Sequence, residues 1–267
     1  MAGELLQDHP ADGVVRLTIS NPDKRGALDH PLLDAIAEAV TRLSGDPTVR
    51  ALILTGRDGR FSSGYDLSGL EGLPRAEFVR RAEALIAHPF TAAIEALEAT
   101  DLPTVAALSG DAMGGALELA LACDLRVAAD HAELAMPPAR LGLVYPHTGL
   151  RRFLDAIGAA RTRELFLLGH AIDPVTALAW GLVNGVAESD ELGDETVRLA
   201  ADLAANSPVS VRGNKQALRA LLAAEARVDP ALEAELVALR EASFSSDDLL
   251  EGVSAFVEKR DPVWPGR

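Results

Sequence analysis

The chain has 267 residues, of which 48% are hydrophobic, and its 25 Lys and Arg against 40 Asp and Glu give a formal net charge of −15 at pH 7. This apolar fraction excludes a disordered chain, and so acidic a surface disfavours binding to nucleic acid or to anionic membranes. A single cysteine excludes a disulfide framework, and the absence of a secretion signal or an apolar run of about 18 residues predicts a cytoplasmic protein outside the membrane.

Short apolar runs alternate with helical patterns along most of the chain. The apolar runs predict strands at residues 14–19, 51–55, 104–108, 124–128 and 182–186. Between them, apolar residues recur at helical spacing, which predicts helices at 31–43, 75–99, 115–122, 149–154, 161–168 and 174–180. Strands that alternate with helices predict an α/β fold with parallel strand pairing.

The end of the chain carries helical patterns only. These patterns are rich in Ala, Leu and Glu and cover residues 192–205, 208–224, 230–244 and 247–259. Helices with one apolar face suit either a lid or a subunit interface. We therefore predict two regions, a core at residues 1–195 and a helical region at 196–267.

Three segments carry residues suited to chemistry. The first is the loop at 59–67, which follows a predicted strand. Its small residues allow a ligand to approach the main chain, and Gly64 permits backbone angles closed to other residues. A plain surface turn is the alternative interpretation. The loop contains no G-x-S-x-G motif, so neither serine is expected to be a hydrolase nucleophile.

The second segment, at 109–118, follows a strand, turns at paired glycines and begins a helix. The first amides of a helix lack internal partners, so the Gly115 N–H could bind a developing oxyanion. Glu118 lies three residues later on the same helical face, where its carboxylate can reach the carbon next to a carbonyl bound there. The alternative is a glutamate that only compensates the helix dipole.

The third segment, at 134–149, contains prolines, glycines and Tyr145. This composition predicts a loop shaped over a cavity, although ordinary connecting structure looks similar. The six histidines show no metal-ligand spacing, so we expect no metal site.

Four motifs in order resemble the crotonase superfamily, the enoyl-CoA hydratase/isomerase group, over essentially the whole chain. They are residues 21–28, Phe61-Ser62-Ser63-Gly64-Tyr65-Asp66-Leu67, Gly114-Gly115-Ala116-Leu117-Glu118 followed by Cys123-Asp124, and residues 252–260. The resemblance implies a spiral of repeated ββα turns and a C-terminal α-helical region that trimerises. It therefore predicts a homotrimer or a dimer of trimers that binds an acyl-CoA substrate and needs no separate cofactor.

The resemblance also implies roles for individual residues. The amides of Tyr65 and Gly115 would form an oxyanion hole, and Glu118 stands where hydratases have the first of two catalytic glutamates. The second glutamate position holds Pro138, which cannot transfer a proton. Tyr145 is a catalytic candidate in the same loop, and the 136–145 stretch together with Tyr65 resembles the methylmalonyl-CoA decarboxylase branch.

Coenzyme A would contact residues from three parts of the chain. Lys24, Arg25, Lys259 and Arg260 are the expected counter-charges for its phosphates, the last two from a neighbouring subunit. The full predicted binding set is Lys24, Arg25, Ala27, Ser62, Ser63, Gly64, Tyr65, Asp66, Leu67 and Lys259.

Three functions stay open at this point. The first, which the resemblance favours slightly, is a hydratase-like lyase acting on an enoyl-CoA. The second is a decarboxylase of a malonyl-type acyl-CoA, which needs the oxyanion donors and one proton donor. The third is a catalytically weak subunit that binds coenzyme A. Isomerase activity has less support, because an isomerase base often stands at the position of Pro138.

Overall fold

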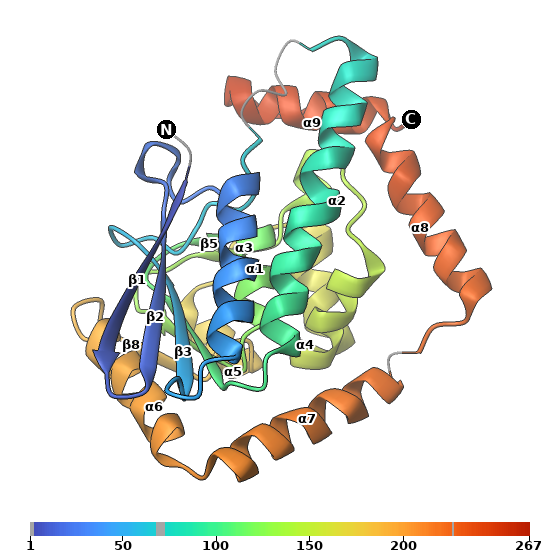
Figure 1. Cartoon of the computed structure of the whole chain (residues 1–267). Coiled ribbons are helices and arrows are strands. Elements are labelled where there is room, and N and C mark those ends of the chain that lie inside the picture. Colours follow the sequence, from blue (N-terminus) through green and yellow to red (C-terminus); the bar gives the residue numbers. More distant parts are fainter. Residues whose placement is uncertain (1–2, 68–72, 226) are drawn as a thin grey trace.

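The computed structural model describes residues 3–67, 73–225 and 227–267, with the side chains of all these except 82–88. Its centre is a six-stranded sheet in the order β1-β2-β3-β4-β6-β8 (Figure 1). The strands are β1 (Glu4–Ala11), β2 (Val14–Ser20), β3 (Ala51–Gly56), β4 (Thr104–Leu108), β6 (Leu125–Ala129) and β8 (Gly185–Ala187). β1 and β2 are antiparallel, and every later pair is parallel. The predicted α/β fold is confirmed.

Strand β1 is not predicted by the sequence pattern. It lies at the edge of the sheet, pairs only with β2, and most of its side chains are exposed or half-buried. An edge strand of this kind needs little apolar surface, so it lacks the alternation that marks a half-buried strand.

A second row of extended segments lies beside the main sheet. It contains β5 (Ala112–Met113) and β7 (Leu134–Ala135), which pair in parallel. Single bridges extend this row from Leu28 to Tyr65, from Ser62 to Ala112, and from Leu134 to Ile172. A strand of the main sheet precedes and a helix follows the segments at 28, 62–65, 112–113 and 134–135, which gives the predicted repeated ββα turns, whereas Ile172 follows a helix. Strands of two residues are too short for a periodicity to reveal.

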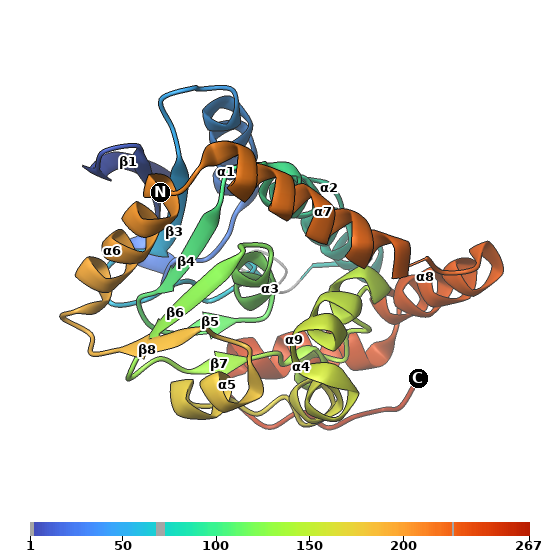
Figure 2. The ribbon, with the colours of Figure 1, turned by 90° about the horizontal axis from the view of Figure 1, so that it is seen from below.

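Helices cover both faces of the main sheet (Figures 1 and 2). Leu52 and Leu54 of β3 face the main core, whereas Ala51 and Ile53 face a second cluster. This split follows from the two-residue alternation of a strand. The main core packs against α1 (His30–Ser44), α2 (Arg75–Ala99), α3 (Gly115–Leu121), α4 (His147–Leu168) and α5 (Pro174–Trp180), and the second packs against α6 (Leu192–Ala205).

Helix α4 replaces two separate predicted helices. The sequence predicts a break between residues 154 and 161, and Gly158 in this interval has φ 73° and ψ 169°, outside the helical region. The chain bends there and continues as a helix, because glycine tolerates positive φ without a steric penalty.

The predicted boundary between residues 195 and 196 falls inside α6, whose Leu192 and Ala200 are buried against the sheet. Beyond α6 the chain forms an arm made of α7 (Pro208–Glu225) and α8 (Pro230–Phe244), and then returns as α9 (Asp247–Glu258) (Figure 1). α7 contacts the core through polar side chains: Lys215 binds the Asp124 carboxylate, and Arg219 binds the Glu98 carbonyl.

Helix α9 packs closely on the short 3-10 helix η2 (Pro138–Leu141) of the same chain. A methyl group on Gly142 would lie 2.5 Å from the Asp248 carbonyl carbon, and one on Gly252 would lie 2.5 Å from the Leu141 carbonyl carbon. Only glycine permits this approach, which brings the C-terminal helix over the segment at 134–149. Within the described ranges, no helix combines the length and apolarity that crossing a membrane requires.

Candidate active site

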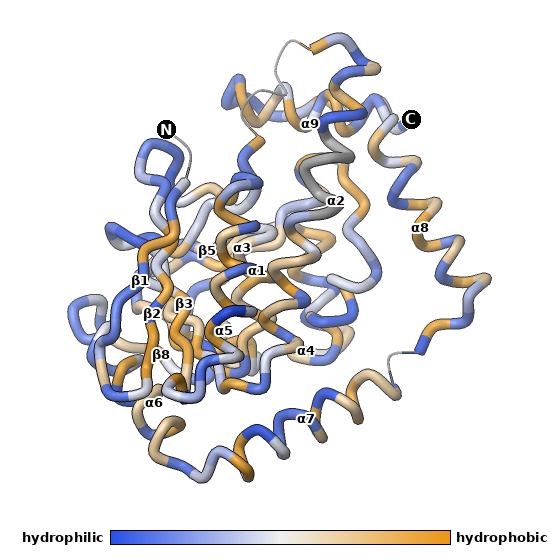
Figure 3. Tube along the Cα trace, in the orientation of Figure 1, coloured by the Kyte–Doolittle hydropathy of each residue, from blue (hydrophilic) through white to orange (hydrophobic). Residues whose placement is uncertain are grey.

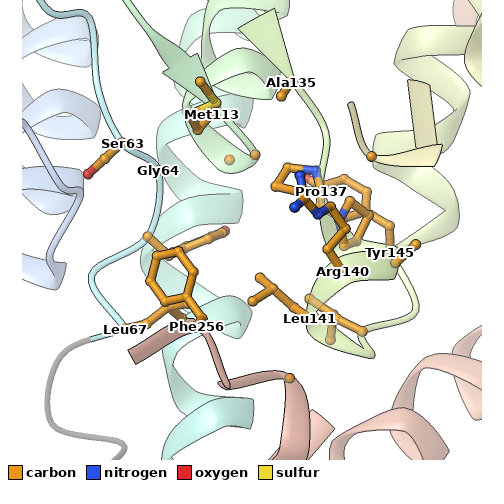
Figure 4. Close-up of a pocket in the computed structure, with 18 of the residues that line it drawn as sticks. Ser63, Gly64, Leu67, Met113, Ala135, Pro137, Arg140, Leu141, Tyr145 and Phe256 are labelled. Atoms are coloured by element: carbon orange, nitrogen blue, oxygen red, sulfur yellow. The ribbon is translucent and has the colours of Figure 1, made fainter. Parts of the chain in front are cut away.

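A cavity of about 1360 Å³ opens between the loop at 63–67 and the segment at 137–145. Figure 4 shows Gly64 and Leu67 on one side and Pro137, Arg140 and Leu141 on the other, with Phe256 of α9 near Leu67. Ligand pockets usually measure about 300–1,000 Å³. The larger volume therefore suits a long ligand.

The backbone of the 63–66 loop runs in parallel beside residue 28. Leu28 donates to the Gly64 carbonyl and accepts from the Asp66 amide. In a parallel bridge the intervening residue faces the other way, so the Tyr65 N–H points away from Leu28. This amide donates to no residue in the described part of the chain.

Gly115 begins α3 immediately beside this loop. A methyl group on Gly64, whose φ is +87°, would lie 2.5 Å from the Met113 carbonyl oxygen and 3.7 Å from the Gly115 nitrogen. As the first residue of a helix, Gly115 has an amide without an intrahelical partner, and no other described residue accepts from it. The structure thus brings two unpaired amides, those of Tyr65 and Gly115, onto adjoining segments that line one cavity.

Glu118 lies one turn further along α3 and is 2% exposed. The Tyr145 hydroxyl donates to its Oε2, and Arg152 Nη1 donates to its Oε1 at 2.9 Å. Arg152 also binds both carboxylate oxygens of Glu98, at 2.6 and 2.9 Å. One buried carboxylate is therefore held by a phenol and by a guanidinium.

Burial is the main cause of the altered proton affinities here. It raises the pKa of Glu118, against the hydrogen bonds from Tyr145 and Arg152, which lower it. Burial also raises the pKa of Tyr145 well above 10, and the nearby Glu118 charge raises it further. Perturbed groups of this kind in a cavity are typical of sites that transfer protons.

A glycine at the start of α4 lets this pair meet. A methyl group on Gly149 would lie 2.5 Å from Tyr145 Cε1 and 2.9 Å from Glu118 Oε1. The Tyr145 ring packs edge-on against Phe166, with centroids 5.3 Å apart. The phenol is thus fixed from two sides against the carboxylate.

The cavity lining is richer in positive charge than the chain as a whole. Among its described lining residues, eight are Lys or Arg and seven are Asp or Glu, against 25 and 40 in the whole sequence. Arg25 and Lys259 line the cavity and form no ion pair with a described residue. An anionic ligand would therefore meet cations here despite the acidic mean charge.

The enoyl-CoA hydratase/isomerase family model matches residues 10–267. A carnitinyl-CoA dehydratase from Salmonella paratyphi A is 34% identical over 260 residues, 95% of either chain. The chain belongs to the enoyl-CoA hydratase/isomerase family. Members of this family, the crotonases, act on acyl-CoA thioesters, and the chain is an acyl-CoA enzyme of this kind.

Solved structures of this family superpose over nearly the whole chain. A methylmalonyl-CoA decarboxylase in complex with 2-nitronate-propionyl-CoA has a TM-score of 0.87 at 26% identity, covering 100% of this chain and 99% of that one. An enoyl-CoA hydratase/isomerase from Pseudoalteromonas atlantica has a TM-score of 0.83 at 28% identity, covering 97% and 99%.

Most predicted crotonase site residues line the cavity, and one does not. Ser62 is fully buried behind the loop, where its Oγ accepts from the Gly64 amide at 3.1 Å. It shapes the loop instead of facing a ligand. The predicted residues that do line the cavity are Lys24, Arg25, Ala27, Ser63, Gly64, Tyr65, Asp66, Leu67, Gly115, Glu118, Tyr145 and Lys259.

Two of the expected phosphate counter-charges are tied to carboxylates. Lys24 binds Asp66 at 2.5 Å, which braces the loop, and Arg260 binds Glu251 at 2.5 Å. We expected Lys259 to come from a neighbouring subunit, but Lys259 of the same chain already lines the cavity, because α9 packs on η2.

Sequence reasoning missed two arginines of the site. Arg152 lies three residues after Gly149, on the same face of α4, and that spacing was the available signal. Arg240 lines the cavity from α8. The clue in the sequence was that it is the one basic residue in the 230–244 helix. Among the described residues, no group of three His, Cys, Asp or Glu side chains is placed to hold a metal ion.

Proposed function

We propose that this crotonase is a lyase that removes the carboxylate of a malonyl-type acyl-CoA through a thioester enolate. The observation that carries the proposal is the composition of the buried end of the cavity. Glu118 is the one buried carboxylate among the described lining residues, and Pro138 stands where a hydratase would have its second glutamate. Decarboxylation needs oxyanion donors and one proton source, and both are at hand.

In this mechanism the thioester oxygen accepts from the Tyr65 and Gly115 amides. The bond between the α-carbon and the carboxylate breaks, carbon dioxide leaves, and the electron pair moves into the enolate. Donors aimed at the oxygen stabilise this charge, and removal of one such donor typically costs ~3–4 kcal/mol. The α-carbon then takes a proton from the Glu118–Tyr145 pair, whose members share a hydrogen bond.

Hydration of an enoyl-CoA is the second candidate function. It is favoured by the 34% identical carnitinyl-CoA dehydratase and by Glu118, which could activate a water molecule. It is disfavoured by Pro138, because a hydratase of this family would have its second catalytic glutamate there and Glu118 would have to act alone. A subunit that binds coenzyme A with little catalysis is the third candidate, and the preserved pair of unpartnered amides speaks against it.

One incubation separates these candidates. The purified protein is mixed with methylmalonyl-CoA in one reaction and crotonyl-CoA in another, and the acyl-CoA products are identified by mass. Loss of carbon dioxide from the first supports the proposal. Addition of water to the second, without decarboxylation of the first, overturns it in favour of a hydratase, and no product from either overturns both.

Coenzyme A enters this reaction as part of the substrate and not as a separate cofactor. Its phosphates would lie near Arg25 and Lys259, two cations of the cavity wall that form no ion pair with a described residue. Exposed leucines on α7, such as Leu218 (63%) and Leu221 (65%), suit burial between copies of this chain. Figure 3 shows apolar residues along the outer arm. We infer a homotrimer or a dimer of trimers.

A further inference from the structure

Arg240 brings to the cavity a positive charge that is not paired with a carboxylate of a described residue. It projects from α8, lines the cavity, and has its Cζ 5.6 Å from the centre of the Phe244 ring. Its Nε is buried and has no hydrogen-bond partner, and its guanidinium forms no ion pair with any residue that the structure describes. A buried donor without a partner is unusual in a folded protein, and in a cavity it indicates a site for an acceptor.

Tyr65 supplies a second unused donor in the same place. Its ring packs against Phe90, with centroids 4.8 Å apart, and lies over Gly115, where a methyl group would be 2.8 Å from Cε2. Its hydroxyl is buried and has no hydrogen-bond partner. The same residue therefore brings both an unpaired amide and an unpaired hydroxyl to the cavity.

The two arginines of this region differ in their pairing. Arg152 is bound to Glu98 and Glu118, so its charge is compensated. Burial lowers the pKa of Arg240. Its charge interacts with Tyr65, Tyr145 and Glu118 through space, but it forms no hydrogen bond with any of them. The Glu118 carboxylate already accepts from Tyr145 and Arg152, so it is not free to pair with Arg240.

We propose that the Arg240 guanidinium and the Tyr65 hydroxyl form a subsite for the carboxylate of the acyl group, which makes 2-carboxyacyl-CoA esters the substrate class. This proposal rests on the proposed function, because it assumes a thioester oxygen held at the Tyr65 and Gly115 amides. A carboxylate on the α-carbon, next to the thioester carbonyl, would then lie close to the cavity residues around Tyr65 and Gly115. Guanidinium and carboxylate pair through parallel, charge-assisted hydrogen bonds, and an acyl group with a fixed positive charge would be repelled.

The subsite acts on binding more than on the chemical step. As the carboxylate leaves as neutral carbon dioxide, its attraction to Arg240 is lost, so the contact stabilises bound substrate and not the transition state. Removal of Arg240 should therefore raise KM without lowering kcat.

The decisive test measures binding without turnover. The dissociation constants of S-(2-carboxypropyl)-CoA and of its neutral counterpart S-(2-methylpropyl)-CoA are compared by calorimetry for wild type, Arg240→Met, Arg240→Lys and Tyr65→Phe. Wild type should prefer the carboxylate analogue roughly ten- to hundredfold, the range expected for hydrogen bonds to a charged group. Arg240→Met should lose that preference, Arg240→Lys should keep part of it, and Tyr65→Phe should reduce it.

Two controls keep the result interpretable. The neutral analogue should bind Arg240→Met as it binds wild type, which shows that α8 is still folded over the cavity. Arg198→Met on the exposed side of α6 removes the same charge at a residue that does not line the cavity and should leave the preference intact.

The outcomes separate this subsite from the proposed reaction. A wild-type protein without carboxylate preference, or an Arg240→Met variant that retains it, overturns the subsite even if carbon dioxide is released. Carboxylate preference that depends on Arg240, in a protein that releases no carbon dioxide, upholds the subsite and overturns the decarboxylase.

Discussion

The Tyr145 hydroxyl donates a hydrogen bond to Oε2 of Glu118, across 27 residues of sequence. The contact joins the loop before α4 to the first turn of α3. It places a phenol beside the buried carboxylate, and in the proposed reaction this pair supplies the proton for the α-carbon. The proposed proton transfer therefore needs no second carboxylate.

Replacing Glu118 by Gln should separate catalysis from binding. Gln keeps the shape of the side chain but cannot transfer a proton, so turnover should fall by about 10²–10⁴-fold. The dissociation constant for a CoA thioether analogue should change little. Steady-state kinetics and calorimetry check this, and unchanged turnover with any competent acyl-CoA would remove Glu118 from the mechanism.

Stability should depend on pH through the same residue. Burial raises the pKa of Glu118 above its ordinary value of 4.5, so between these two values the folded protein keeps a proton that the unfolded chain has released. The stabilisation is complete below 4.5 and is lost as pH rises through the raised pKa. Wild type should therefore lose stability relative to Glu118→Gln over this window.

Urea unfolding of both proteins from about pH 4 to about pH 8 measures this difference. A difference in free energy of unfolding that stays constant, or that grows in favour of wild type with rising pH, would contradict the raised pKa.

Gly149→Ala should disturb the Glu118–Tyr145 contact directly. The added methyl group would lie 2.5 Å from the Tyr145 ring and 2.9 Å from the Glu118 carboxylate, so one of them must move. We expect a loss of about 1–3 kcal/mol in stability, typical of overpacking, together with lower turnover. Gly193→Ala in α6, with nothing within 4 Å of the new methyl group, is the matched control and should leave activity unchanged.

Binding of coenzyme A should weaken as salt rises, because ions screen the attraction between phosphates and exposed cations. Lys259→Gln should weaken binding at low salt and flatten its salt dependence, since Lys259 lines the cavity. Arg198→Gln, on the exposed side of α6 and not among the lining residues, serves as the charge control. Equal affinity at low and high salt in wild type would argue against ionic phosphate contacts.

Native mass spectrometry should find three or six chains per particle. Leu218 and Leu221 on α7 are 63% and 65% exposed, and a specific interface buries about 1,200–2,000 Å². The double substitution Leu218→Glu with Leu221→Glu should dissociate the assembly, whereas Ala220→Glu, on the other side of the helix from Leu218, should not. A wild-type monomer would refute the assembly.

Much of the fold could be read from local patterns. The parallel strands and most helices follow from runs and spacings of apolar residues, and the glycines at 114 and 115 mark the turn into α3. β1, β5 and β7 could not be predicted, because an edge strand and two-residue strands are stabilised by pairing with distant segments and carry no periodicity of their own.

By itself the sequence determined which residues form compact motifs: the loop around Gly64, the helix start at Gly115, and Glu118 one turn later. Only the tertiary structure decided which distant side chains meet. Arg152 reaches Glu118 across 34 residues, Ser62 turns away from the cavity, and Arg240 arrives from α8. The physical reason is that backbone preference and apolar periodicity act over a few residues. The partner of a buried charge is set by how separate helices pack against one another.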